Sequence, residues 1–235
     1  MGQTTLTDLV GEVQSGLLNR TDLTNDRCTT ALNFAQWRVS RSHDFQELKG
    51  FFQTQTFFTN NAFNDKFISL PPYLKHIHTI ILNPGDPTAR KLVHKPWRLF
   101  DKQWPAPEVL ARSKPYYYSK WGSAAAIVYP VPDAVYPVWS RITTFPRPFD
   151  FNQQPLAYSD YDWKDDILIA LACAYLWKSY GRMDKANDYL REAQEHFVTA
   201  VKQDTDEPDL EISLDLTDAG YVGNYWQDPF IKVSP

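Results

Sequence analysis

The chain has 235 residues, of which 43% are hydrophobic and 15% aromatic, and its formal net charge is −4. This length is enough to bury a core without disulfides, as one large domain or a core domain with an insertion. The acidic balance argues against a broad nucleic-acid-binding surface, because such surfaces are usually basic. We see no signal peptide. The longest apolar run, residues 167–177, is too short to span a bilayer, so we expect no membrane association.

Two amphipathic helices are predicted within residues 1–48. Thr5 and Asp8 have the spacing of a capping box, and apolar residues follow them at helical intervals. A break then offers Thr21 or Asp22 as the N-cap of a second helix. The apolar stripe of that helix comprises Cys28, Ala31, Leu32, Ala35 and Val39. We therefore expect a helical hairpin at the start of the chain.

Residues 49–155 are predicted to form a β-rich insertion, because prolines accumulate there and the helical period is lost. One helical turn is expected near residues 108–112. Strands are expected within residues 51–58, 66–70, 75–82, 90–95, 115–121, 124–129 and 136–145. Tight turns at Gly122-Ser123 and Pro132-Asp133 separate the last three strands, so these predict a β-meander.

Residues 156–203 predict a second helical hairpin. Its first helix is apolar on every face, which is typical of a central, buried helix. We expect Asp160 or Asp162 to cap this helix, Gly181 to end it and Asp184 to cap the next one. The fold class is therefore predicted as α+β: a helical bundle built from both ends of the chain, with an inserted antiparallel sandwich or meander. Residues 204–235, acidic and then aromatic, are predicted to be an extended tail.

The residues that could carry chemistry show no catalytic pattern. Cys28 and Cys173 lie among apolar residues and predict buried free thiols. His76 and His78 could be two metal ligands on one strand face, but no third ligand lies near them in sequence. Asp165 and its neighbour favour the dipole of a helix start. We therefore expect no enzyme, no cofactor and no metal.

The aromatic residues of the β region allow two interpretations. They could stack on a sugar, or they could build the core and subunit contacts, which aromatic residues in strands do more often. We favour the second. The residues concerned are Trp97, Trp104, Tyr116, Tyr117, Tyr118, Trp121 and Trp139.

Five stretches between about residues 4 and 203 together resemble a known family. They are LTDLVGEV, ALNFAQWRVSRSHDF, FISLPPYLKHIHTIIL, KPYYYSKWGSAAAIVYPVPDAVYPVWSRITTFPRPF and DDILIALACAYLWKSYGRMDKANDYLREAQEHF. In their order and spacing they resemble the two opening helices, the first long strand, the meander and the closing helical hairpin of head-to-tail adaptor (head completion, connector) proteins of short-tailed bacteriophages. The loop at residues 95–114 and the tail depart from that pattern.

The resemblance implies a structural virion protein at the head–tail interface, assembled in the host cytoplasm. It implies a homo-oligomeric ring of about twelve copies under the portal protein, with the β insertion meeting the downstream tail (nozzle) protein. DNA would pass through the lumen without specific binding. We expect the tail to dock on the portal or on an adjacent subunit through Tyr221, Tyr225, Trp226 and Phe230, since aromatic anchors dominate interface energies.

Two other functions remain as alternatives. The aromatic β region is compatible with a carbohydrate-binding tail module. A virion-associated hydrolase with a dispersed triad is the less favoured alternative, and its histidine would be His94 or His196.

Overall fold

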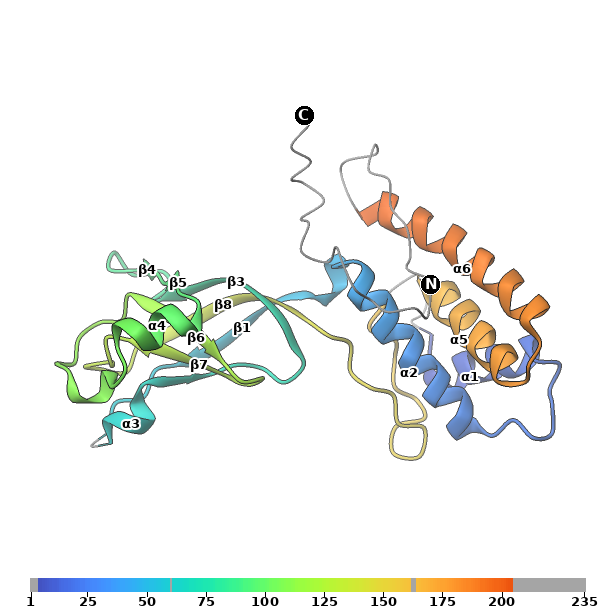
Figure 1. The fold of residues 1–235 in the computed structure, drawn as a ribbon, viewed down its shortest axis with the longest axis horizontal. Helices are drawn as coiled ribbons and strands as arrows, with labels where there is room; N and C mark the ends of the chain where they lie inside the picture. The colour runs from blue at the N-terminus through green and yellow to red at the C-terminus, as the bar shows by residue number, and fades with distance from the viewer. Residues whose placement is uncertain (1–3, 60, 162–163, 205–235) are drawn as a thin grey trace. The chain divides into compact units, whose positions relative to one another are not determined.

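The computed structural model describes residues 4–59, 61–161 and 164–204 (Figure 1). Within them the chain divides into two compact units. The helical unit comprises residues up to 46 and from 148 onward, and the β unit comprises residues 47–147. The presence of both helices and antiparallel strands confirms the α+β class.

In its described residues, the helical unit contains four long helices: α1 (Leu6–Gly16), α2 (Asn25–Ser42), α5 (Asp165–Ser179) and α6 (Met183–Asp204). Helix α5 is central, because it packs against α1, α2 and α6 (Figure 1). Nine of its fifteen residues are buried, as expected of a helix that is apolar on every face. The predicted stripes of α1, α2 and α6 also face this core, where Leu9, Leu32 and Phe197 are fully buried.

The helix starts only partly match the predictions. Thr5 caps α1 in a complete capping box with Asp8, as predicted. Helix α2, in contrast, is capped by Thr24, whose hydroxyl accepts from the Arg27 N–H. Thr21 and Asp22 precede it in a turn, and Asp22 pairs with Arg20 instead.

The expected caps of α5 and α6 are also wrong. Helix α5 begins after Lys164, whose side chain makes no capping bond, whereas Asp160 lies before this start and Asp162 falls outside the described residues. Asp184 lies inside the first turn of α6 and pairs with Arg182 at 2.9 Å. A carboxylate in this turn still favours the helix dipole, so its charge suits the place even though it is not the cap.

Gly181 ends α5, as predicted, with a φ of +74°. Its N–H donates to the Lys178 carbonyl and the Arg182 N–H donates to the Trp177 carbonyl, at 2.9 and 3.0 Å. This pair of bonds defines a Schellman motif, which requires a left-handed residue at the position that Gly181 occupies.

Apart from residue 60, which is not described, the β unit contains eight strands, two short α-helices and two 3₁₀ turns. Its helices are α3 (Ala62–Asp65) and α4 (Trp97–Gln103), and the turns are η1 (Gln46–Leu48), which begins at the last residue of the helical unit, and η2 (Pro107–Val109). Its strands are β1 (Lys49–Gln55), β2 (Phe67–Ser69), β3 (Leu74–Leu82), β4 (Arg90–Lys91), β5 (Val93–His94), β6 (Tyr117–Trp121), β7 (Ala125–Tyr129) and β8 (Pro137–Thr144).

The strands form two four-stranded sheets, and this overturns the predicted meander. The first sheet has the order β1-β8-β3-β4 and the second the order β2-β7-β6-β5. Strands β6 and β7 do pair across the predicted turn at Gly122, but β8 leaves them and pairs with β1 and β3. The Pro132-Asp133 segment therefore connects two sheets. Asp133 accepts a hydrogen bond there from the Tyr136 hydroxyl, which raises the pKa of Tyr136 to about 12.

Residues from both sheets share one buried cluster. Alternate residues of β8 and β7, such as Val138 and Val128, belong to this cluster together with Ile80 of β3 and Ile68 of β2. Period-two alternation therefore places one face of each sheet in the core and leaves the other face for further contacts.

Two glycines of α1 give opposite predictions for the same substitution. A Cβ at Gly11 meets no atom within 4 Å, whereas a Cβ at Gly16 meets Cys173 Sγ at 2.8 Å and the Tyr189 hydroxyl at 3.2 Å. Gly11→Ala should therefore stabilise the helical unit by about 0.5–1 kcal/mol. Gly16→Ala should destabilise it, because α1 loses its close approach to α5 and α6. Urea unfolding of both variants tests this, and a stabilising Gly16→Ala would contradict the packing.

Candidate functional site

An aromatic cluster covers the outer face of the second sheet. Helix α4 packs on β6, and Trp104, which follows it, stacks on Tyr117 and Tyr129 with ring centroids 5.1 and 4.1 Å apart. Phe100 is buried beneath these rings and meets Trp104 edge-on. Helix α4 was not predicted from the sequence, although it begins at Trp97 and ends next to Trp104, the two tryptophans of the proline-rich loop. These rings pack against one another, so their main role is to hold α4 on the sheet.

The seven aromatic residues considered for sugar stacking do not form one surface. Tyr118 belongs to the buried cluster, and Trp139 lies on β8 of the first sheet. Trp97 and Trp121 remain half-exposed side by side, with centroids 6.2 Å apart and an edge-to-face angle of 75°. The structure thus divides this set between core packing and two separate exposed faces.

The outer face of the first sheet also carries exposed aromatic side chains. Phe51 of β1 is 69% exposed and lies opposite Arg141 of β8, whose guanidinium is 5.5 Å from the ring centre. The next outward pair is Gln53 with Trp139, which is 42% exposed. β1 is an edge strand, where large exposed apolar side chains are unfavourable in water. Such side chains are typical of a surface that contacts a partner protein.

A buried ion-pair network in the β unit, which was not predicted from the sequence, fixes the loops around Thr59 and Arg112. The Asp65 side chain is 0% exposed and accepts from the Thr59 N–H, the Thr59 hydroxyl and Arg112. Burial alone would raise the pKa of Asp65, but these three partners outweigh it and hold the pKa below its ordinary value. Beside it, Lys66 pairs with Glu108 at 3.0 Å. These residues are up to 47 positions apart, so no local spacing indicates the network.

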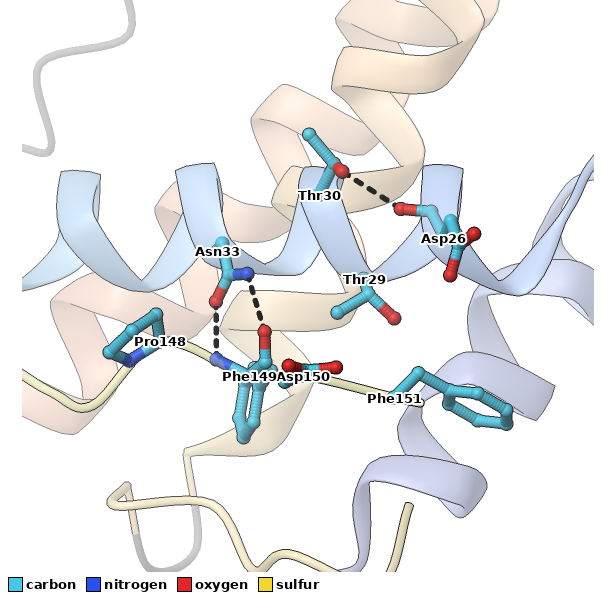
Figure 2. A pocket seen from close by; sticks show the side chains of 8 residues that line it. All are labelled: Asp26, Thr29, Thr30, Asn33, Pro148, Phe149, Asp150 and Phe151. Atoms are coloured by element: carbon cyan, nitrogen blue, oxygen red, sulfur yellow. Dashed lines mark hydrogen bonds between the residues drawn. The ribbon is translucent and has the colours of Figure 1, made fainter. Parts of the chain in front are cut away.

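A small hollow of about 330 Å³ lies where residues 148–151 cross α2 (Figure 2). The Asn33 side chain forms part of its wall and makes two hydrogen bonds to the backbone of Phe149. The Asn33 amide group donates to the Phe149 carbonyl at 3.0 Å, and the Asn33 side-chain oxygen accepts from the Phe149 N–H at 2.7 Å. Asn33 thus pairs with backbone as a neighbouring strand does. These two bonds hold residues 148–151 on α2, so the hollow has a structural role.

The histidines are not part of a metal-ligand group in the described part of the chain. His78 Nε2 lies 2.8 Å from the Thr143 hydroxyl, and within the described ranges no three His, Cys, Asp or Glu residues gather as metal ligands. The ring centroids of His94 and Tyr118 lie 5.2 Å apart in the β unit, and His196 lies 3.8 Å from Glu192 in the helical unit.

Both cysteines are buried and free, as predicted. Burial raises the pKa of Cys28 to about 11 and that of Cys173 to about 12. The thiols therefore stay protonated at neutral pH, whereas the thiolate is the nucleophilic form.

The predicted tail anchors Tyr221, Tyr225, Trp226 and Phe230 lie outside the described residues. At the last described position, the Asp204 carboxylate accepts from the Gln46 N–H at 3.1 Å and contacts His43 Nε2 at 2.9 Å. The C-terminal end of α6 is therefore fixed against residues 43–46. Among the described helices, none combines the length and apolarity needed to cross a membrane.

Both units expose groups of aromatic side chains, which is typical of proteins that bind other proteins. The sequence profile of the SU10 adaptor protein family matches residues 4–218. The chain belongs to this family, which consists of phage head-to-tail adaptors, so it is a structural virion protein, associated with portal and tail proteins at the head–tail interface. No curated protein matches the chain.

Proposed function

We propose that the chain forms a closed ring of about twelve copies between the portal and the tail nozzle, and that DNA passes through the ring. The observation that carries this proposal is the family match over residues 4–218. Identical chains close into a ring when two different surfaces of one copy meet head to tail. The net charge of −4 suits a passage for DNA, because a strongly basic lumen would bind phosphates and retard the genome.

The β unit supplies the contact with the tail protein in this proposal. Its support is the outer face of the first sheet, where Phe51, Trp139 and Arg141 are exposed together. Aromatic and arginine side chains are enriched at protein interfaces, and they bind most strongly where neighbouring contacts exclude water.

The copy number of the chain in purified virions tests the ring. Quantitative mass spectrometry of tryptic peptides measures this chain relative to the portal protein. A ratio near one is the expected result, because stacked rings of matching symmetry hold similar copy numbers. Absence from the particle, or many copies per portal chain, would exclude the ring.

The tail is expected to anchor the ring on the portal or on an adjacent subunit. Truncation after Gln203 removes the four predicted anchors, and it should weaken binding to portal by about tenfold or more, since a single buried aromatic anchor is worth about 2 kcal/mol. Co-sedimentation with portal rings measures the loss. A matched control, Asp206→Asn with Glu207→Gln, keeps the aromatics and should bind normally. Full binding by the truncated chain would refute the tail hypothesis.

A further inference from the structure

One face of α2 is basic and aromatic along its whole length. Its outward residues follow one another at intervals of three, four or one positions, which places them on one side of a helix. We call this face the α2 stripe. It comprises Arg27, Thr30, Phe34, Trp37, Arg38 and Arg41. The stripe contains three arginines, and the exposed carboxylate of Asp26 lies beside its N-terminal end.

The aromatic residues of the stripe are exposed together with a ring of α5. Phe34, Trp37 and Tyr175 are 47%, 40% and 48% exposed, and the rings of Phe34 and Tyr175 lie 5.2 Å apart. Single exposed apolar side chains are ordinary, but a contiguous group marks an interaction surface. Tryptophan and arginine are also the residue types that most often dominate binding energy.

A hollow of opposite charge lies on other helices of the same unit. It is formed by α1, α5 and α6, has a volume of about 590 Å³ and has Ile169, Ala170 and Tyr189 in its wall. We call it the acidic hollow. Five carboxylate residues line it: Asp8, Glu12, Asp165, Asp166 and Glu192.

We infer that the α2 stripe of one copy packs into the acidic hollow of the next copy. This inference rests on the ring proposed above and names its two surfaces. Stripe and hollow are complementary in charge, and each offers apolar groups beside the charges. Two stripes facing each other would instead place arginine against arginine. When this pairing repeats from copy to copy in one direction it is head to tail, the type of contact that closes rings.

Charge reversal in assembled particles tests the pairing. The stripe variant is Arg27→Glu with Arg41→Glu, and the hollow variant is Glu12→Lys with Glu192→Lys; all four side chains are exposed. Each variant alone should lower incorporation into virions at least about tenfold, and the four changes combined in one chain should restore it. Arg191→Glu, which is exposed on α6 outside the lining of the hollow, is the matched control and should incorporate normally.

Photo-crosslinking then identifies the partner of the stripe directly. Benzoylphenylalanine in place of Trp37 should crosslink, in intact virions, to peptides of α1 or α6 from another copy. Crosslinks to the portal, the tail protein, DNA or another α2, or no crosslink in assembled particles, would overturn the inference. So would failure of the combined reversal to restore assembly. If these results occur while the copy ratio stays near one, the ring stands and only the surface assignment fails; a ratio far from one contradicts the ring itself.

Discussion

Phe197→Ala is expected to destabilise the helical unit by about 4 kcal/mol, the usual range for a buried phenylalanine truncated to alanine being about 3–5 kcal/mol. Phe197 on α6 is 0% exposed and meets Phe45 edge-on at 6.0 Å. Phe45 in turn meets Tyr161 at 5.9 Å, and the Tyr161 hydroxyl donates to the Gln36 carbonyl of α2. Truncation leaves a cavity inside a chain of edge-to-face rings, and such rings cannot collapse without losing their geometry.

Guanidinium unfolding followed by tryptophan fluorescence and far-UV circular dichroism measures this loss. Trp177 is buried in the helical unit and reports on it. Because the chain has two units, the analysis must allow two transitions. Phe197→Leu is the matched control, since it keeps most of the volume, and it should cost less than half as much. A loss below about 1 kcal/mol for the alanine variant would show that the rings are not a stabilising core.

Asp65→Ala is expected to cost the β unit about 3 kcal/mol, at the lower end for a broken buried ion pair because Arg112 keeps some contact with solvent. The substitution leaves the Arg112 guanidinium, the Thr59 N–H and the Thr59 hydroxyl without their acceptor. Asp65→Asn is the matched control: it keeps the shape and one acceptor oxygen but removes the charge. It should fall between the wild type and the alanine variant.

The same carboxylate predicts an acid-dependent loss of stability. The pKa of Asp65 is lower in the folded protein than in the unfolded chain, where this pKa is about 3.9. Its contribution is therefore complete above the unfolded pKa and disappears as the pH falls through the folded pKa. Unfolding of the β unit at pH 7 and near pH 3 should show a smaller difference between wild type and Asp65→Asn in acid. An equal difference at both pH values would contradict the ionised, paired state.

The helical unit could be predicted well because its signals are local. The capping box at Thr5, the apolar stripes and the terminating glycine at residue 181 all act within a few positions of chain. The errors at the other helix starts have one cause. Asp22, Asp160 and Asp184 each have the side chain of an N-cap, but the structure uses Thr24 for α2 and no side-chain bond at all for α5. Composition identifies a helix start only to within a few residues.

Strand pairing in the β unit could not be predicted from turns. Pro132 and Asp133 have the chemistry of a hairpin turn, yet β8 pairs with β1, more than eighty residues earlier in the chain. The buried residues of β8 belong to the core cluster that both sheets share. Burial of this kind overrides the preference of a local turn sequence for a hairpin. Helix α4 escaped notice because its seven residues lie between Pro96 and Pro105, so too few turns repeat to show a period.

The candidate surfaces, too, could be predicted only in part. The aromatic residues of the β region were recognised, but their division between core, α4 and two outer faces depends on contacts that only the folded chain makes. The α2 stripe and the acidic hollow could not be predicted from helical periodicity, because this pattern indicates only the apolar, core-facing side of each helix. The polar sides of α1, α5 and α6 form a hollow only after these helices pack.

The position of the β unit within the chain sets the order in which the protein can be completed during synthesis. Helices α1 and α2 leave the ribosome first, but α5, the helix on which both pack, is made only after the whole β unit. At about 5–20 residues per second, that delay is on the order of 5–20 s. Until α5 is made, Leu32 and Ala35 lack their partner helix, whereas the β unit has its whole sequence before α5 begins. We therefore expect the β unit to become protease-resistant on stalled ribosomes before α2 does, which makes the nascent helical hairpin the segment most in need of a chaperone.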